Sequence, residues 1–356
     1  MTRRGALAGD SPEPVESLGT LIEAGDLNGL LRAVDGLCAA GGWDDLVDLA
    51  DRCEEAVERG KQLWPIAGHI DYRLALEAPG EYASDVLDSV TPRFSIGPLT
   101  EVAAFGHTWE ELAPHLGSPH VAAYVAQERV LRGEDLTGDP RAHPEVLGLP
   151  LKIEPWEPVY PLAAYRSTFV EVAEPWEPHT GLADIEPMAA EEVDDPELIS
   201  ALLDLVAPWL TESNGAARAV AVEGDAVGAA SALSLGALRM GPLEVAEAIQ
   251  RMGWAAASGG AHGRRRGAAL GRSLAWYTAG VTAATGWPAA AEVLEGALES
   301  LRWYRFDEGA PDEGWSLRLA VEHSGEGWAA AIAATDLTHE ILDGGHGGDG
   351  DTTSRC

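Results

Sequence analysis

The stretch Ser258-Gly-Gly-Ala-His-Gly-Arg-Arg-Arg-Gly-Ala-Ala-Leu-Gly-Arg-Ser-Leu-Ala-Trp-Tyr277 decides how the second half of the chain folds. Every fourth residue from Gly263 is small, and the series continues through Gly267, Gly271, Ala275, Ala279 and Ala283. Positions four apart lie above one another on a helix, so these residues form a shallow groove along one side. Leu270, Leu274, Tyr277 and Val281 form an apolar stripe beside the groove. The pattern predicts a long, closely packed helix with a cationic first turn.

The cationic residues of this stretch are the first candidates for a functional site. The loop before the helix offers backbone N–H donors, and the start of a helix attracts anions. Guanidinium groups bind phosphate or carboxylate in a bidentate manner, and histidine can act as an acid or a base. A binding site for a small anionic ligand is therefore one hypothesis, and its residues are His262, Arg264, Arg265, Arg266 and Arg272.

Two other interpretations of the same residues remain open. The arginines can pair with acidic side chains, and small residues four apart usually serve tight helix packing. The segment can also form a docking patch for a partner protein. No P-loop, GxGxxG, GxSxG, HExxH or zinc-type spacing of Cys and His occurs, so the sequence identifies no cofactor, no metal site and no catalytic residue.

Composition restricts the classes of function. A chain of 356 residues is long enough for two domains. Its 58 acidic residues outnumber 24 basic ones, which gives a formal net charge of -34 and argues against nucleic-acid binding. We interpret the acidity as a well-solvated surface, and the alternatives are a nucleic-acid mimic or a basic partner. Three scattered cysteines suit a reducing cytoplasm, and the segment from Ser273 to Leu294 is too weakly apolar for a membrane span, so we expect no membrane partner.

Residues 15–138 read as an array of helices. One apolar series runs from Leu27 to Cys38 and stops at Gly41-Gly42, and a second runs from Leu46 to Val57 and stops at Gly60. Thr108 and Glu111 have the spacing of a capping box. These signals predict consecutive amphipathic helices without a fixed repeat length.

Residues 139–196 form a proline-rich connector that contains ten of the 22 prolines. Glu-Pro-Trp-Glu-Pro occurs at 154–158 and again at 174–178, and each copy should be extended. We interpret the segment as a strap packed on a domain face. The alternative is a docking segment for a partner, built on Trp156 and Trp176.

Residues 197–340 predict an α+β domain around the Gly/Ala-rich helix, and 341–356 a disordered tail. Strands are expected at 218–223, 302–306 and 317–322, and helices at about 195–210, after Asp225, after Pro242 and at 328–334. Glu223 and Glu322 close equivalent strands and could face one another as paired carboxylates, although strand-end carboxylates more often face solvent or pair with arginine.

Four stretches resemble an uncharacterised actinobacterial family that carries only a domain-of-unknown-function label. They are Gly-Gly-Ala-His-Gly-Arg-Arg-Arg-Gly-Ala-Ala with Gly271-Arg272, Leu-Arg-Trp-Tyr-Arg-Phe-Asp at 301–307, Gly-Trp-Ser-Leu-Arg-Leu-Ala-Val-Glu at 314–322, and Glu-Ser-Asn-Gly at 212–215. The resemblance implies a cytoplasmic bacterial protein and assigns no activity or catalytic residue.

The sequence therefore predicts a mainly α protein with a small α+β part: an N-terminal helical array, followed by a C-terminal domain with a small sheet flanked by helices. The leading hypothesis for its function is a non-enzymatic binding or scaffold protein whose helical half contacts a protein partner. The second hypothesis is an enzyme or sensor that binds a small anionic ligand at the segment from His262 to Arg272.

Overall fold

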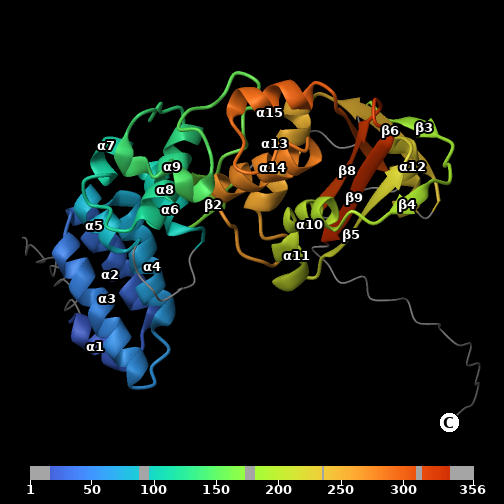
Figure 1. The fold of residues 1–356 in the computed structure, drawn as a ribbon. Coiled ribbons are helices and arrows are strands. Elements are labelled where there is room, and N and C mark those ends of the chain that lie inside the picture. Colours follow the sequence, from blue (N-terminus) through green and yellow to red (C-terminus); the bar gives the residue numbers. More distant parts are fainter. Residues whose placement is uncertain (1–16, 88–95, 173–180, 235, 310–314, 337–356) are drawn as a thin grey trace, which may run out of the picture. The chain divides into compact units, whose positions relative to one another are not determined.

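A computed structural model describes residues 17–87, 96–172, 181–234, 236–309 and 315–336. The chain forms two compact units (Figure 1). Unit 1 contains residues 1–174 and, in addition, the nine residues Arg265–Ser273; unit 2 contains residues 175–264 and 274–356. The stretch 139–196 thus divides between the units after Glu174. Its second Glu-Pro-Trp-Glu-Pro copy, with Trp176, lies outside the described residues, as does the tail 341–356.

Unit 1 is built from helices whose ends follow local signals. The Thr108–Glu111 capping box is confirmed, Asp26 caps the second helix by accepting from the Gly29 N–H, and Gly41 ends that helix in the left-handed conformation. The helices are α1 (Leu18–Ala24), α2 (Leu27–Ala40), α3 (Trp43–Glu58), α4 (Trp64–Glu77), α5 (Gly80–Asp85), α6 (Leu99–Gly106), α7 (Trp109–Leu112), α8 (Pro119–Leu131), the 3₁₀ helix η1 (Pro140–Ala142) and α9 (Pro144–Leu147).

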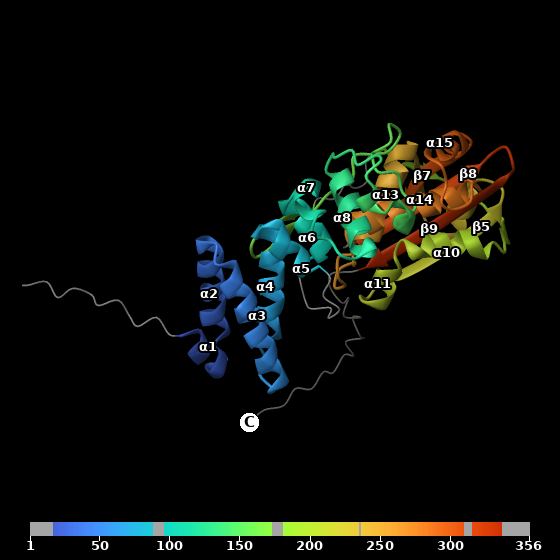
Figure 2. The same cartoon turned by 60° about the vertical axis from the view of Figure 1, so that its left-hand side comes forward.

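Two apolar clusters hold unit 1 together. Leu30, Leu46 and Ile70 are fully buried members of the cluster among α1–α4 (Figure 2). The second cluster lies among α4–α8 and includes Val102, Val125 and Tyr165, the last from a short hairpin. That hairpin consists of β1 (Ala164–Tyr165) and β2 (Val170–Glu171), which pair antiparallel. The proline-rich stretch up to residue 172 is therefore part of the packed unit.

Unit 2 contains an antiparallel sheet of seven strands in the order β3-β6-β7-β8-β9-β5-β4. Across its centre Val220, Ala331 and Ala320 lie side by side, because Ala331 pairs with both neighbours. The strands are β3 (Ala183–Ile185), β4 (Glu191–Val193), β5 (Ala216–Glu223), β6 (Leu238–Leu243), β7 (Arg302–Asp307), β8 (Trp315–His323) and β9 (Trp328–Asp336).

Helices pack on both faces of this sheet. The alanine-rich α12 covers the face that bears Val220, Ala320 and Ala331. On the opposite face, Trp254 of α13 stacks on Trp315 with ring centroids 5.0 Å apart. The helices of unit 2 are α10 (Pro196–Asp204), α11 (Ala207–Thr211), α12 (Ala226–Leu233), α13 (Val245–Ala257), α14 (Ala268–Thr282) and α15 (Ala291–Leu298), of which α14 contributes its first six residues to unit 1.

The prediction of a mainly α fold with a small α+β part is wrong. The protein is 49% helix and 16% strand, and the seven-stranded sheet makes it a substantial α+β fold. The expected strands at 218–223, 302–306 and 317–322 are present, but residues 328–334, expected as a helix, form β9. Alanine favours helices in isolation, yet a central strand between two helical layers needs small side chains, and packing overrides the local preference.

The central helix also begins later than the sequence pattern indicates. α14 starts at Ala268, so Gly263, Arg264, Arg265, Arg266 and Gly267 precede it, and the arginines do not form a first helical turn. Within α14 the predicted ladder of small residues is buried, at Gly271, Ala275 and Ala279. Pro242, expected to open a helix, lies in β6, and α13 starts three residues later after the capping residue Glu244. None of the helices in the described ranges is long and apolar enough to cross a membrane.

Candidate functional site

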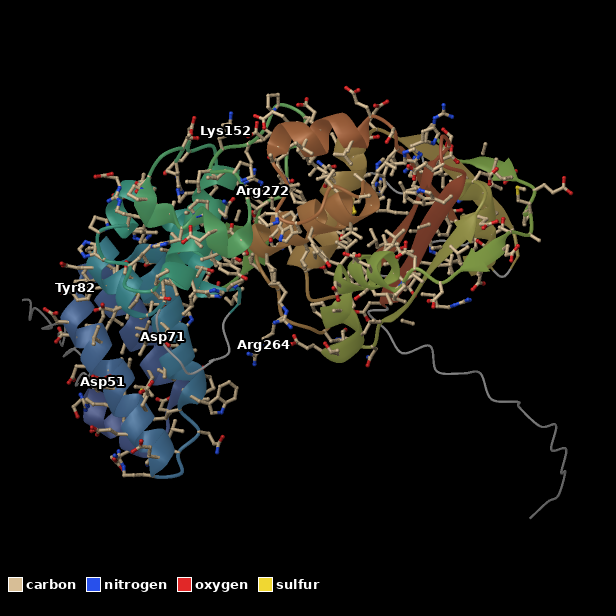
Figure 3. The ribbon with its side chains drawn as sticks, in the orientation of Figure 1. Asp51, Asp71, Tyr82, Lys152, Arg264 and Arg272 are labelled. Atoms are coloured by element: carbon tan, nitrogen blue, oxygen red, sulfur yellow. The ribbon has the colours of Figure 1, made fainter. Side chains whose placement is uncertain are left out.

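The first part of the predicted site is a glycine-rich loop in unit 2. Gly260 has a positive φ of 77°, and a Cβ atom there would lie 2.1 Å from an oxygen of Asp336. The absence of a side chain lets the Ala261 N–H donate to the buried Asp336 carboxylate at 2.6 Å, and the His262 N–H donates to Ser213 Oγ at 3.0 Å. The His262 and Arg264 side chains are exposed, and Arg264 extends away from the ribbon (Figure 3).

The next residue, Arg265, belongs to unit 1 and is paired with a buried carboxylate of α6. Its Nε donates to Glu101 Oε2 at 2.8 Å and its Nη2 donates to Oε1 at 2.7 Å. Glu101 is 0% exposed, and Tyr165 also donates its hydroxyl proton to Oε2 at 2.7 Å. This is a bidentate ion pair removed from solvent, in which the geometry satisfies both charges.

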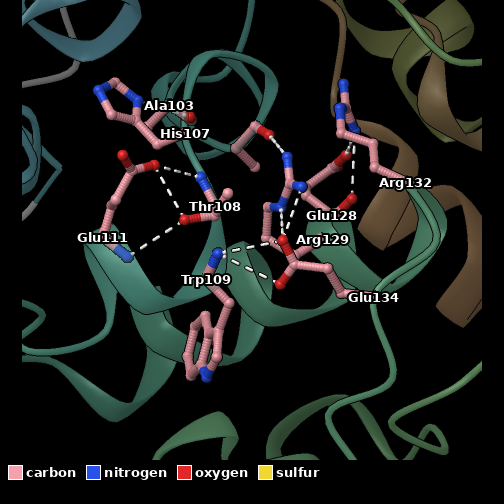
Figure 4. A network of polar contacts seen from close by, with 10 residues as sticks. Ala103, His107, Thr108, Trp109, Glu111, Glu128, Arg129, Arg132 and Glu134 are labelled. Carbon is pink, nitrogen blue, oxygen red and sulfur yellow. Dashed lines mark hydrogen bonds and ion pairs between the residues drawn. The ribbon is translucent and has the colours of Figure 1, made fainter.

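A second buried carboxylate, Glu128 of α8, occupies the start of α14. Its Oε1 accepts the Ala269 N–H at 2.7 Å. Its Oε2 accepts from Arg132 Nη1 at 2.8 Å, a contact that Figure 4 shows. Gly267 has a φ of 98° and a Cβ atom there would lie 3.2 Å from Glu128 Oε1, so glycine permits the approach. The sequence predicted that a small anionic ligand binds near the start of this helix; in the structure the side chain of Glu128 occupies the helix start.

Arg272, four residues into α14, is fully buried and uses all five of its N–H donors. Glu157 accepts from Nε at 2.8 Å and from Nη2 at 2.6 Å, and Gln127 Oε1 accepts from Nη1 at 2.6 Å. The remaining two protons go to the backbone oxygens of Pro150 and Lys152, at 3.1 and 2.8 Å. Figure 3 shows Arg272 directed at the segment that carries Lys152. Glu157 comes from the first Glu-Pro-Trp-Glu-Pro copy, which gives that motif a structural role in unit 1.

The pKa values of the two buried carboxyl groups Glu101 and Glu128 are shifted in opposite directions. Burial alone would raise the pKa of Glu101, but the charge and hydrogen bonds of Arg265 and the Tyr165 hydroxyl outweigh it and hold that pKa below its ordinary value. Burial and the nearby charge of Glu101 raise the pKa of Glu128 to about 7, although Arg132 and the Ala269 N–H oppose the shift. Burial and Glu101 also raise the pKa of Tyr165. Glu101 therefore carries the negative charge that neutralises Arg265, and Glu128 takes up a proton more readily.

The acidic partners are the residues that sequence reasoning missed. Glu101 and Glu128 lie within short apolar helices, and Glu157 lies within a proline-rich motif. A charged residue on the apolar face of a helix is a signal for a buried pair, and Glu128 of α8 is such a residue. The contacts of these carboxylates with Arg265, the Ala269 N–H and Arg272, however, join residues more than 100 positions apart, so no local spacing reveals them.

The five predicted residues are thus distributed over both compact units. His262 and Arg264 belong to unit 2, and Arg265, Arg266 and Arg272 belong to unit 1. Arg266 is half-buried. A ligand at Arg265 or Arg272 would have to displace Glu101 or Glu157, so the anion-site hypothesis stays a prediction without support from these contacts.

The other chemical candidates do not come together. Glu223 ends β5 and Glu322 lies at the end of β8, and β9 separates these two strands. The two carboxylates also lie on opposite faces of the sheet, because Glu322 pairs with Ala329 whereas Glu223 pairs with Trp328. Glu322 instead accepts the Ala226 N–H at the start of α12 at 3.0 Å. Among the residues that the structure describes, no group of three or more His, Cys, Asp or Glu is placed to hold a metal ion. Burial raises the pKa of the Cys38 and Cys53 thiols to about 11, which keeps them protonated.

Residues 28–338 match the model of a family described as a family of unknown function (DUF6183), and the chain belongs to this family. No curated protein and no solved structure matches the chain.

Proposed function

We propose that the protein is a non-enzymatic binding protein of the bacterial cytoplasm, and that α3 of its helical unit binds a basic segment of a partner protein. The observation that carries the proposal is a line of exposed carboxylates along α3. Five of them are spaced four, three, four and three residues apart, which aligns them on one side of a helix. They are Asp44, Asp48, Asp51, Glu55 and Glu58.

The charge of this part of the chain supports a basic partner. Residues 17–87 contain 14 acidic side chains and 5 basic ones. The basic neighbours of the line form long, exposed pairs: Arg52 lies 3.5 Å from Asp48, and Arg59 lies 3.8 Å from Glu55. Exposed pairs of this kind are worth about 0.2–1 kcal/mol, so cations of a partner can replace them at small cost.

An apolar contact point accompanies the line. Val47 is 38% exposed and lies one turn from both Asp44 and Asp51 on the same helix. Interfaces combine an apolar contact with a charged rim, and the rim sets the association rate and the choice of partner. Figure 3 shows Asp51 on the outer side of α3.

Two further observations favour binding over catalysis. The thiols of Cys38 and Cys53 are buried and protonated, and the buried carboxylates Glu101 and Glu157 are engaged with arginines. The buried free thiols of Cys38 and Cys53 also suit a reducing compartment.

The test is the affinity for a lysine-rich 16-residue helical peptide, measured by fluorescence anisotropy at low and high salt. The test variant replaces four carboxylates of α3: Asp44→Asn, Asp48→Asn, Asp51→Asn and Glu55→Gln. A matched control removes four exposed charges from unit 2: Glu186→Gln, Glu191→Gln, Glu192→Gln and Glu223→Gln.

We expect the α3 variant to weaken binding at least tenfold and the control to change it less than twofold. The reason is that only the aligned carboxylates of α3 can face several lysines of one peptide at once. Binding should also weaken with salt, since the charges are exposed. Equal losses in the two variants would mean that the peptide senses only the net charge, and would reject α3 as the surface.

A further inference from the structure

One half of a sheet face in unit 2 is open, although α12 covers the other half. On this face Val220 of β5, Ala331 of β9 and Ala320 of β8 lie side by side, and all three are buried. Two residues further along each strand Arg218 is exposed, and Ala333 and Arg318 are half-buried. α12 is only eight residues long and cannot cover strands of eight and nine residues, because a helix rises about 1.5 Å per residue and a strand about 3.3 Å.

Two arginines face each other across this open half. Arg218 of β5 and Arg318 of β8 both pair with Ala333 of β9, so the three side chains point to the same face in one row. Neighbouring strands are about 4.8 Å apart, which places the two Cα atoms about 10 Å apart, and both extended side chains can reach a point above the methyl group of Ala333. Arginines face each other here in a chain with only 24 basic residues against 58 acidic ones.

The next row adds hydroxyl groups. Ser316 and Thr335 pair directly with each other, lie two residues from Arg318 and Ala333, and therefore share their face. Both are half-buried. The residues of this face between and beside the two arginines, Ala333, Ser316 and Thr335, are all small.

Arg318 retains donor capacity. Its Nη1 lies 3.3 Å from Glu308 Oε2, and its side chain is 17% exposed. Its Nε is buried and has no hydrogen-bond partner among the described residues. An unsatisfied buried N–H is destabilising, and an oxyanion that accepts its hydrogen bond would remove that penalty.

We propose that this open half-face binds a phosphate monoester, held by Arg218 and Arg318 and by the hydroxyls of Ser316 and Thr335. Two guanidiniums can each donate two parallel hydrogen bonds to the oxygens of a phosphate dianion, and the hydroxyls donate to the oxygen nearest the sheet. The ligand is either a free phosphorylated metabolite or a phosphorylated side chain of a protein. Both present the same group to the site.

The experiment is isothermal titration calorimetry of the full chain with inorganic phosphate, O-phosphoserine and a phosphoserine peptide, at constant ionic strength in chloride. Arg218→Lys keeps the charge and removes the planar fork, Thr335→Val removes one hydroxyl at constant volume, and Glu308→Gln removes the competing carboxylate. Arg302→Ala is the matched control, because Arg302 lies on the same face at the other end of β7 and its side chain is 67% exposed.

We expect saturable binding that Arg218→Lys weakens at least tenfold, Thr335→Val weakens several-fold and Glu308→Gln strengthens. Arg302→Ala should leave it unchanged. A tighter dissociation constant for the peptide than for O-phosphoserine assigns the site to a phosphorylated protein, and equal constants assign it to a small phosphate. The proposal is overturned if no phosphate compound binds, or if Arg218→Lys and Arg302→Ala behave alike.

Discussion

Buried glutamates decide how the cationic residues of this acidic chain are used. Glu101 and Glu157 each hold one arginine through two hydrogen bonds, and Glu128 accepts a backbone N–H and an arginine N–H. The arrangement satisfies each buried charge where it lies, and breaking such a pair costs more than removing both partners. Function at the arginine segment would therefore compete directly with the stability of unit 1.

The raised pKa of Glu128 predicts a dependence of stability on pH. Its pKa is about 7 in the folded protein against 4.5 ordinarily, so the folded state holds the proton more tightly than the unfolded state. The free energy of unfolding that this group contributes should therefore fall as pH rises from about 4.5 to 7, by about 3 kcal/mol, and then stay level.

Urea unfolding of the wild type and of Glu128→Gln at pH 5, 6, 7 and 8 checks this. The difference in unfolding free energy between the wild type and Glu128→Gln should fall across the lower part of that range. Burial also raises the pKa of Asp71 to about 7, but taking the difference between the two proteins cancels the contribution of this and other groups. The groups that face Glu128 are Glu101, Arg132, Arg265 and the Ala269 N–H. A constant difference from pH 5 to pH 8 would show that Glu128 stays ionised throughout.

At the scale of elements, two helices begin on carboxylates from distant parts of the chain. Glu128 of α8 accepts the Ala269 N–H of α14, and Glu322 of β8 accepts the Ala226 N–H of α12. Both helices are rich in small residues, which permits close packing but offers little apolar area at the helix start. The carboxylates accept hydrogen bonds from backbone N–H groups at the helix start, which have no partner within the helix.

Gly267 is the residue that lets α14 approach its carboxylate, and Gly133 provides a matched control. Their φ values are 98° and 99°, but a Cβ atom at Gly267 would lie 3.2 Å from Glu128 and from Pro98, whereas nothing lies within 4 Å at Gly133. Both alanine substitutions should lose about 1 kcal/mol to backbone strain, and Gly267→Ala should lose about 1–2 kcal/mol more from the displaced carboxylate. Chemical denaturation of both variants measures these losses. Equal losses would show that the absence of a side chain at Gly267 is not needed for the contact with Glu128.

Local signals were sufficient for some elements and insufficient for others. The ends of α2 and the start of α7 could be predicted because Asp26, Gly41, Thr108 and Glu111 act within one turn of themselves. β9 could not, because its run of alanines favours a helix until two helical layers enclose it. The ion pairs could not be predicted either: the arginines are visible in the sequence, but the choice of Glu101 and Glu157 among 58 acidic residues depends on the packed fold.

At the scale of the molecule, the chain returns to unit 1 for the nine residues Arg265–Ser273, between stretches that belong to unit 2. Arg265 and Arg272 lie near the two ends of this segment, and their buried ion pairs with Glu101 and Glu157 hold it in unit 1. The central claim of this account is that the most cationic stretch of a protein with a net charge of -34 completes its own fold, which leaves the acidic surface of α3 and the open half-face of the sheet for binding.

A double-mutant cycle between Arg272 and Glu157 tests that claim most directly. The free energy of unfolding should fall by about 3–5 kcal/mol in Arg272→Met and in Glu157→Leu, since each leaves a buried charge or its donors unpaired. The double variant should be more stable than either single variant, with a coupling of at least about 2 kcal/mol. Single variants that unfold like the wild type, with additive effects in the double variant, would contradict a structural role for the arginine segment.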